Sequence, residues 1–206
     1  MGPPVSFRDY ERTRKESVCM KLIESPLDGA YVIEPEKKGD ERGYFARLFC
    51  ADVFKEHGLE SQFVQVNHSK SHMKGTLRGL HYQLPPKEEV KVVKCVHGAI
   101  FDVIVDLRPD SATFGQHFSA HLSQENGLMM VVPKGFAHGF YSLEPETEIV
   151  YFVSENYSPE HERGVRWDDP YFNIKWPGRP VVLSDKDTGH EDFDEQRHKE
   201  AYSVLV

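Results

Sequence analysis

Several features are absent from this sequence of 206 residues, and each absence excludes a class of protein. No apolar run approaches the about 20 residues that a membrane-spanning helix needs, and residues 1–19 contain no stretch typical of a signal peptide. Positive charge is also scarce, with 25 Lys and Arg against 33 Asp and Glu, whereas nucleic-acid binders carry excess Lys and Arg. We therefore expect a cytoplasmic protein with neither a membrane nor a nucleic acid as partner.

The sequence has only three cysteines, and their spacing fits no disulfide or metal-binding motif. Cys19, Cys50 and Cys95 form neither a CxxC motif nor an even disulfide framework, which indicates free thiols in a reducing compartment. The chain also lacks a G-x-S-x-G turn, a P-loop and a G-x-G-x-x-G motif between a strand and a helix. Nucleophilic hydrolysis, nucleotide hydrolysis and hydride transfer therefore lose most of their support.

A set of metal-ligating histidines is missing as well. His81 has no second imidazole near it in the sequence, and His117 and His121 would lie about 13 Å apart on a strand. The sequence therefore predicts no metal site.

Short strands with alternating apolar residues dominate the chain. Phe118, Ala120 and Leu122 alternate with polar residues in 117–123, and further short strands are expected at 90–96, 99–107 and 128–133. The segment 147–154 is nearly apolar on both faces, as expected of a central strand. Helix signals are confined to 51–58, which ends at Gly58, and to a possible C-terminal helix in 191–205. The pattern predicts an all-β jelly roll with short peripheral helices, formed by one domain over residues 20–206 after a tail at 1–19.

Polar residues inside such a barrel need an explanation, because a buried polar group without a partner costs about 1–3 kcal/mol. The stretch GTLRGLHYQ places Arg78 and His81 in a strand, and Lys91, His138 and Tyr151 lie in or beside other strands. His81 alone could be either a packed core histidine or a catalytic base. Together these acid–base groups suit proton transfer at a carbon beside a carbonyl group.

Seven stretches in the same order resemble the dTDP-4-dehydrorhamnose 3,5-epimerase family. They are DERGYF (40–45), FVQVNHSKS (63–71), LRGLHYQ (77–83), FDVIVDLRPDSATFGQ (101–116), PKGFAHGF (133–140), NYSPEHERGVRWDDP (156–170) and LSDKD (183–187). The resemblance implies a cupin-like double-stranded β-helix, a homodimer, no metal or organic cofactor, and a nucleotide-diphospho-sugar substrate.

The resemblance also implies catalytic roles. His81 matches the general base that removes a proton beside the C4 ketone, and Asp187 matches the carboxylate paired with it. Tyr151 matches the acid that returns a proton on the opposite face of the sugar, and Lys91 matches the cation near the developing enolate oxygen.

The remaining matches are to residues that bind the substrate. Two arginines match the diphosphate clamps, two aromatic residues match those near the base, and three polar residues match the pocket lining; these are Arg42 and Arg78, Phe45 and Tyr157, and Gln65, Asn67 and His138. At Arg47 the sequence departs from thymidine-specific members, which carry a glutamate there, so Arg47 either contacts a different nucleobase or forms a structural ion pair.

Alternatives remain within and outside this chemistry. A single-centre (C3 or C5) epimerase or a keto-isomerase acting on a GDP- or CDP-linked sugar would use the same groups. A cupin that binds a sugar nucleotide without turning it over would not need both His81 and Tyr151. A metal-dependent cupin oxygenase predicts stoichiometric iron in the purified protein.

Overall fold

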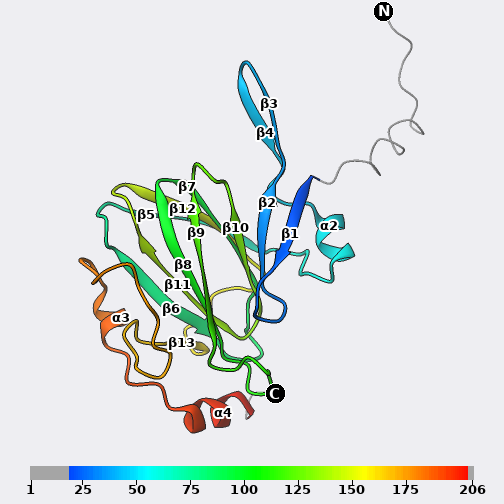
Figure 1. Ribbon diagram of the computed structural model, residues 1–206. Coiled ribbons are helices and arrows are strands. Elements are labelled where there is room, and N and C mark those ends of the chain that lie inside the picture. Colours follow the sequence, from blue (N-terminus) through cyan, green and yellow to red (C-terminus); the bar gives the residue numbers. More distant parts are fainter. Residues whose placement is uncertain (1–18, 204–206) are drawn as a thin grey trace, which may run out of the picture.

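Two antiparallel β-sheets packed face to face account for most of the computed structural model, which describes residues 19–203 (Figure 1). Six strands form the first sheet in the order β1 (Met20–Glu24), β2 (Tyr31–Pro35), β10 (Met129–Val132), β7 (Lys91–His97), β12 (Thr147–Val153) and β5 (Gln65–Ser71). Five strands form the second in the order β13 (Glu162–Gly164), β6 (Leu77–Gln83), β11 (Phe136–Ser142), β8 (Ala99–Asp106) and β9 (His117–Ser123). The expected jelly roll is confirmed.

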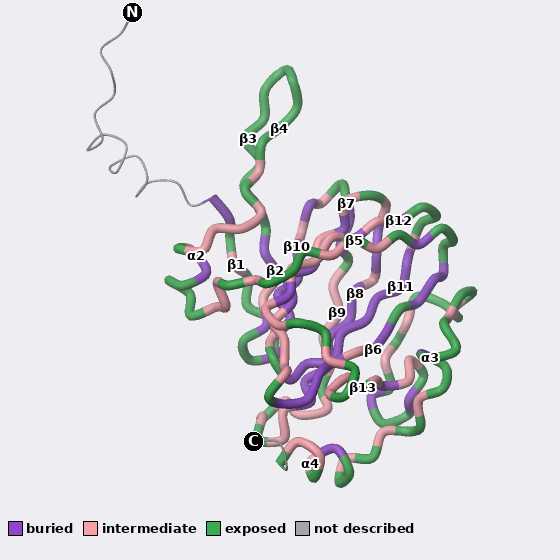
Figure 2. The backbone as a smooth tube through the Cα atoms, turned by 180° about the vertical axis from the view of Figure 1, so that it is seen from behind, coloured by how far each residue is buried: buried purple, intermediate pink, exposed green. Residues whose placement is uncertain are grey.

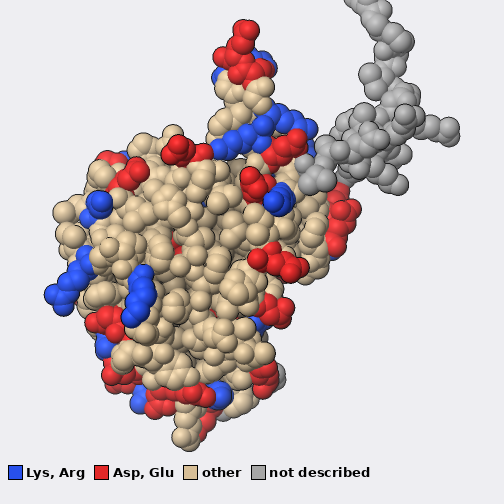
Figure 3. All heavy atoms as spheres, in the orientation of Figure 1, with Lys and Arg blue, Asp and Glu red and all other residues tan. Residues whose placement is uncertain are grey.

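A hairpin of β3 (Lys37–Asp40) and β4 (Gly43–Ala46) projects from the body of the molecule (Figure 1). Nearly all of it is exposed (Figure 2), and acidic side chains gather at its tip (Figure 3). Its strands pair only with each other, and among its residues Ala46 alone, at the end of β4, is half-buried. The hairpin is therefore available for contacts outside the chain.

Helices are short and peripheral. They comprise α2 (Ala51–Glu56), α3 (Asp185–Thr188) and α4 (Glu195–Ser203). The predicted C-terminal helix is confirmed by α4, and the helix expected at 51–58 is confirmed by α2, beyond which Gly58 adopts a positive φ of 69°. No helix in residues 19–203 combines the length and hydrophobicity that crossing a membrane would require.

The core follows from the alternation of side chains along the strands. In β8, Ile100 and Ile104 pack between the two sheets, whereas Val103 and Val105 face a second cluster beneath the C-terminal segment. Each fully buried aliphatic side chain contributes about 1.5–3 kcal/mol to stability. The C-terminal segment therefore covers the outer face of the five-stranded sheet and closes the core on that side.

All five predicted strands are present, within one residue of their predicted ends. The segments 90–96, 99–107, 117–123, 128–133 and 147–154 correspond to β7, β8, β9, β10 and β12. The three cysteines are free, as expected, and burial raises the pKa of the Cys95 thiol to about 11. Of the predicted tail, residues 1–18 lie outside the described residues, while Cys19 is buried in the core.

Glycine is required where β6 and β11 approach each other. Gly79 has a φ of 102°, and a Cβ atom there would lie 2.6 Å from the carbonyl oxygen of His138. The pairing of these strands also shifts register between His138 and Phe140. This close approach places the side chains of β6 and β11 next to each other at one end of the barrel.

Candidate active site

A cavity of about 430 Å³ opens between the two sheets, and several polar side chains converge on it. Six of the residues predicted from the sequence line it, namely Arg78, His81, Lys91, His138, Tyr151 and Asp187. They come from β6, β7, β11, β12 and α3, so both sheets and the C-terminal segment contribute. Residues scattered over more than half of the sequence are thus brought to one site.

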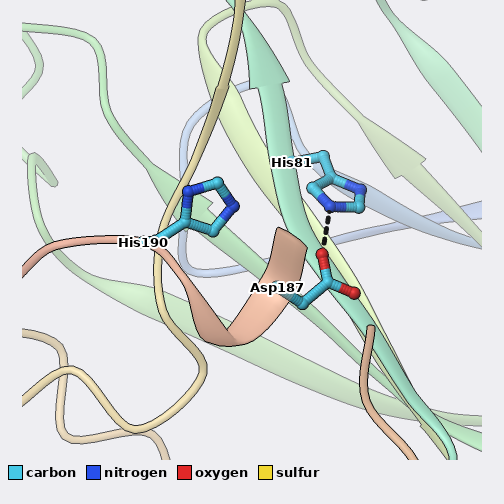
Figure 4. A group of neighbouring side chains, drawn as sticks. All are labelled: His81, Asp187 and His190. Atoms are coloured by element: carbon cyan, nitrogen blue, oxygen red, sulfur yellow. Dashed lines mark hydrogen bonds and ion pairs between the residues drawn. The ribbon is translucent and has the colours of Figure 1, made fainter. Parts of the chain in front are cut away.

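His81 and Asp187 form a tight pair at this cavity. The Nε2 atom of His81 lies 2.6 Å from Oδ1 of Asp187, which is only 3 % exposed (Figure 4). With Nε2–H donating to the carboxylate, the imidazole is held in the tautomer whose Nδ1 carries a free lone pair. An imidazole in this state can act as a base.

Asp187 is itself held in place by the start of α3. Its backbone N–H donates to the hydroxyl oxygen of Ser184 at the helix N-cap, and its Oδ2 accepts a 3.4 Å hydrogen bond from the N–H of Gly79. Burial alone would raise the pKa of Asp187, but its hydrogen bonds, chiefly the one with His81, outweigh burial and lower it. Asp187 is therefore an anion at neutral pH.

Tyr151 reaches the cavity from the opposite sheet. It lies on β12 between Val93 of β7 and Asn67 of β5, whereas His81 lies on β6 of the second sheet. Burial, followed by the charge of Glu89, raises the pKa of the phenol, so the hydroxyl keeps its proton at neutral pH. An acid and a base thus line one cavity from its two walls.

Two carboxylates that sequence reasoning did not identify support other polar residues of the cavity. Glu89 forms a 2.9 Å ion pair with Lys91, and the fully buried Asp102 accepts a 2.8 Å hydrogen bond from Nε2–H of His138. His138 is also the direct cross-strand neighbour of His81. Asp102 could have been recognised as a carboxylate between Ile100 and Ile104 on an apolar face.

A second histidine near the His81–Asp187 pair was also missed. His190 follows α3, and its ring points toward the pair (Figure 4). One ligand atom from each of these three residues lies within 4.8 Å of the other two. Burial lowers the pKa of His190. His81 therefore has no second imidazole near it in the sequence, but the fold brings His190 close to it.

Six predicted substrate-binding residues do not line the cavity of the single chain. Arg42 and Phe45 lie on the β3–β4 hairpin, Arg47 follows it, Gln65 and Asn67 lie on the edge strand β5, and the exposed Tyr157 lies in the segment before β13. The hairpin projects away from both sheets, which is why its side chains do not reach this cavity (Figure 1).

Two of these residues, Arg42 and Tyr157, have side-chain partners in the part of the chain that the structure describes. Arg42 forms an ion pair and hydrogen bonds with Asp40, and the Tyr157 hydroxyl donates to Glu162, which also pairs with Lys186 at the cavity. Arg47 forms no ion pair within residues 19–203, and its role stays a prediction.

Comparison with known proteins gives consistent matches over most of the chain. The model of the family described as dTDP-4-dehydrorhamnose 3,5-epimerase matches residues 24–195. A dTDP-4-dehydrorhamnose 3,5-epimerase of Shigella flexneri is 47% identical over 175 residues, which cover 84% of this chain and 96% of the relative.

Solved structures agree with this match. The Bacillus anthracis dTDP-4-dehydrorhamnose 3,5-epimerase, with TDP and PPi bound, superposes with a TM-score of 0.82 at 45% identity, covering 84% of this chain and 99% of that one. The Legionella pneumophila dTDP-6-deoxy-D-glucose-3,5-epimerase, in complex with dTDP-4-keto-L-rhamnose, gives 0.81 at 40% identity, covering 91% and 97%. The matches cover most of the chain and agree with its strand order and cavity. The chain therefore belongs to the dTDP-4-dehydrorhamnose 3,5-epimerase family.

Proposed function

We propose that this chain inverts C3 and C5 of a dTDP-4-keto-6-deoxy sugar, with His81 as the base and Tyr151 as the acid. The observation that carries the proposal is that these two residues line one cavity from opposite sheets. Inversion needs a proton to leave one face of the sugar ring and another to arrive on the opposite face. A single group on one face would only restore the original configuration.

The first step is removal of a proton from carbon. The C4 ketone acidifies the hydrogens on C3 and C5, and the free Nδ1 lone pair of His81 takes one of them. The resulting imidazolium is stabilised by Asp187, 2.6 Å from Nε2. The electron pair moves onto the C4 oxygen as an enolate, and Lys91 supplies positive charge to stabilise it.

The second step returns a proton on the opposite face. The Tyr151 hydroxyl, which makes no hydrogen bond within residues 19–203, donates its proton to the carbanionic carbon as the ketone re-forms. After one inversion His81 holds an extra proton and Tyr151 has lost one, so both must exchange protons with solvent before the second inversion. Solvent hydrogen is therefore expected at each inverted carbon.

We further propose that the chain acts as a homodimer whose hairpins complete the substrate sites. Phe45 on the hairpin is 65% exposed, and Val64 and Val66 at β5, the last strand of the six-stranded sheet, are 55% and 59% exposed. Exposed apolar residues on a projecting hairpin and an open sheet edge are typical of interaction surfaces. In a dimer, Arg42 and Phe45 of one copy could reach the diphosphate and the base bound by the other, and Arg78 would provide the second guanidinium.

A cytoplasmic location is also part of the proposal. It is supported by three cysteines that all remain free thiols, as is usual in a reducing compartment.

The test is to incubate the enzyme with dTDP-4-keto-6-deoxyglucose in deuterated water and to follow C3 and C5 by NMR. Deuterium at both carbons is the expected result. His81→Ala should abolish exchange at both carbons, whereas His121→Ala, a matched change at an exposed histidine of β9, should not.

Other outcomes would contradict the proposal in distinct ways. Exchange at one carbon only would indicate the single-centre epimerase. No exchange with the dTDP-, GDP- or CDP-linked substrate would leave a sugar-nucleotide-binding cupin. Full activity of His81→Ala would remove His81 from the mechanism.

A further inference from the structure

The histidine that lies beside the catalytic pair has an unused nitrogen. The Nε2 atom of His190 is inaccessible to solvent and has no hydrogen-bonding partner within the described residues. In Figure 4 the ring directs this side toward His81 and Asp187, while the Nδ1 side of His81 faces away from it. A buried polar atom without a partner costs about 1–3 kcal/mol, which a bound ligand would recover.

The position of His190 depends on the absence of a neighbouring side chain. Gly164 of β13 is the direct cross-strand partner of His81, and a Cβ atom on Gly164 would lie 2.0 Å from Nε2 of His190. The imidazole therefore occupies the space that a side chain at position 164 would fill. Two imidazoles and a carboxylate are thereby gathered on one side of β6.

We propose that His81, Asp187 and His190 bind a zinc ion and that this ion reversibly inhibits the enzyme. Two imidazole nitrogens and one carboxylate oxygen are ligands that Zn²⁺ commonly takes, with a fourth position left to water. Ligand atoms about 2.0–2.1 Å from a tetrahedral zinc lie about 3.3 Å from one another.

The present distances fit such an ion after small side-chain movements. His81 and Asp187 need to separate by less than 1 Å from their 2.6 Å contact, and the third ligand atom already lies within 4.8 Å of both. Gly79 and Ser184 support Asp187 from behind, as the surrounding hydrogen bonds of metal ligands commonly do.

Inhibition follows from the tautomer that the ion imposes, and this part of the inference rests on the proposed role of His81. Zinc takes the place of the proton on Nε2 of His81. The neutral ring then carries its proton on Nδ1, transferred through solvent, so Nδ1 has no lone pair to accept a proton from the sugar. No group is oxidised or reduced, and removing zinc with a chelator restores the original tautomer.

The test compares zinc affinities of the full chain, freed of metal with EDTA, by competition against a chromophoric chelator. The wild type should bind one equivalent of zinc tightly, and His190→Gln should lower the zinc affinity by more than about 100-fold. Losing a metal ligand costs more affinity than losing a group that only supports a ligand, and the latter already costs up to about 100-fold. His57→Gln, a matched change at an exposed histidine after α2, should leave the affinity unchanged. Thermal unfolding of the metal-free proteins checks that each variant is folded.

Activity provides the second measurement. Metal-free His190→Gln should epimerise at a rate within about twofold of the wild type, and zinc that silences the wild type should leave this variant active. Equal zinc affinity in the two proteins, no binding by the wild type, or equal inhibition of both would overturn the inference. If the wild type binds zinc but the metal-free wild type shows no deuterium exchange at C3 or C5, the proposed function is contradicted instead. The two failures are therefore distinguishable.

Discussion

Replacing Asp187 by Asn tests how the enzyme makes His81 a base. The change keeps the size of the side chain and removes the negative charge that lies 2.6 Å from the imidazole. Two unit charges about 4 Å apart interact by about 4 kcal/mol at the effective dielectric constant of a protein site. The amide oxygen still accepts a neutral hydrogen bond worth about 1 kcal/mol, so a net loss of about 2–3 kcal/mol is expected.

That loss falls on the step in which His81 becomes positively charged. It corresponds to a decrease of about 30- to 150-fold in kcat, with little change in KM because the lost interaction acts on the proton-transfer step. The assay is the rate of deuterium incorporation from deuterated water at C3 and at C5, measured separately by NMR. Because one base serves both carbons, the two rates should fall by the same factor.

Asp185→Asn is the matched control, since Asp185 lies on the same short helix but is exposed. It should leave both rates unchanged. A kcat of Asp187→Asn within threefold of the wild type, or a loss at one carbon only, would refute a shared base held by this carboxylate.

Further predictions concern the hairpin and the stability of the fold. Phe45→Ala should raise the KM for the dTDP-sugar about 10-fold or more, because base–aromatic stacking contributes about 1–3 kcal/mol. Tm should not fall, because Phe45 is 65% exposed in the described chain; Tyr44→Ala is the control, and equal KM values would refute the role. His198 is buried, with Nδ1 accepting from the Tyr82 hydroxyl and Nε2–H donating to the Leu107 carbonyl, and burial lowers its pKa below 6.5. As pH falls below about 6.5, His198 therefore takes up a proton in the unfolded chain before it does so in the folded protein, which destabilises the fold. The Tm advantage of the wild type over His198→Gln should therefore shrink between pH 8 and pH 5.5. A constant difference in Tm would contradict this prediction.

The strands could be predicted because each needs only local information. Alternation of apolar and polar side chains marks β9 and β8, and turn residues mark their ends. The β3–β4 hairpin carries no such alternation, because neither of its faces packs on the core. Its strands were therefore not identified from the sequence, although its residues Arg42 and Phe45 were.

The active site was harder to predict because its contacts are distant in sequence. His81 and Asp187 lie 106 residues apart, and only the family resemblance paired them. Glu89 and His190 were missed because nothing in the local sequence shows that they face Lys91 and His81. Asp102 stands out as a carboxylate on an apolar face, but the sequence does not show that it faces His138. Their roles depend on strand register and on the path of the C-terminal segment, which the sequence pattern does not determine.

The central claim is that a base and an acid act on opposite faces of one sugar, and Tyr151→Phe tests it most directly. This variant keeps the ring in place and removes the proton that it donates. The measurement is the ratio of inverted product to deuterium exchange at the same carbon in deuterated water. We predict that exchange persists at one carbon or more while inversion there falls by at least about 100-fold. Inversion and exchange that remain in their wild-type ratio would contradict the account.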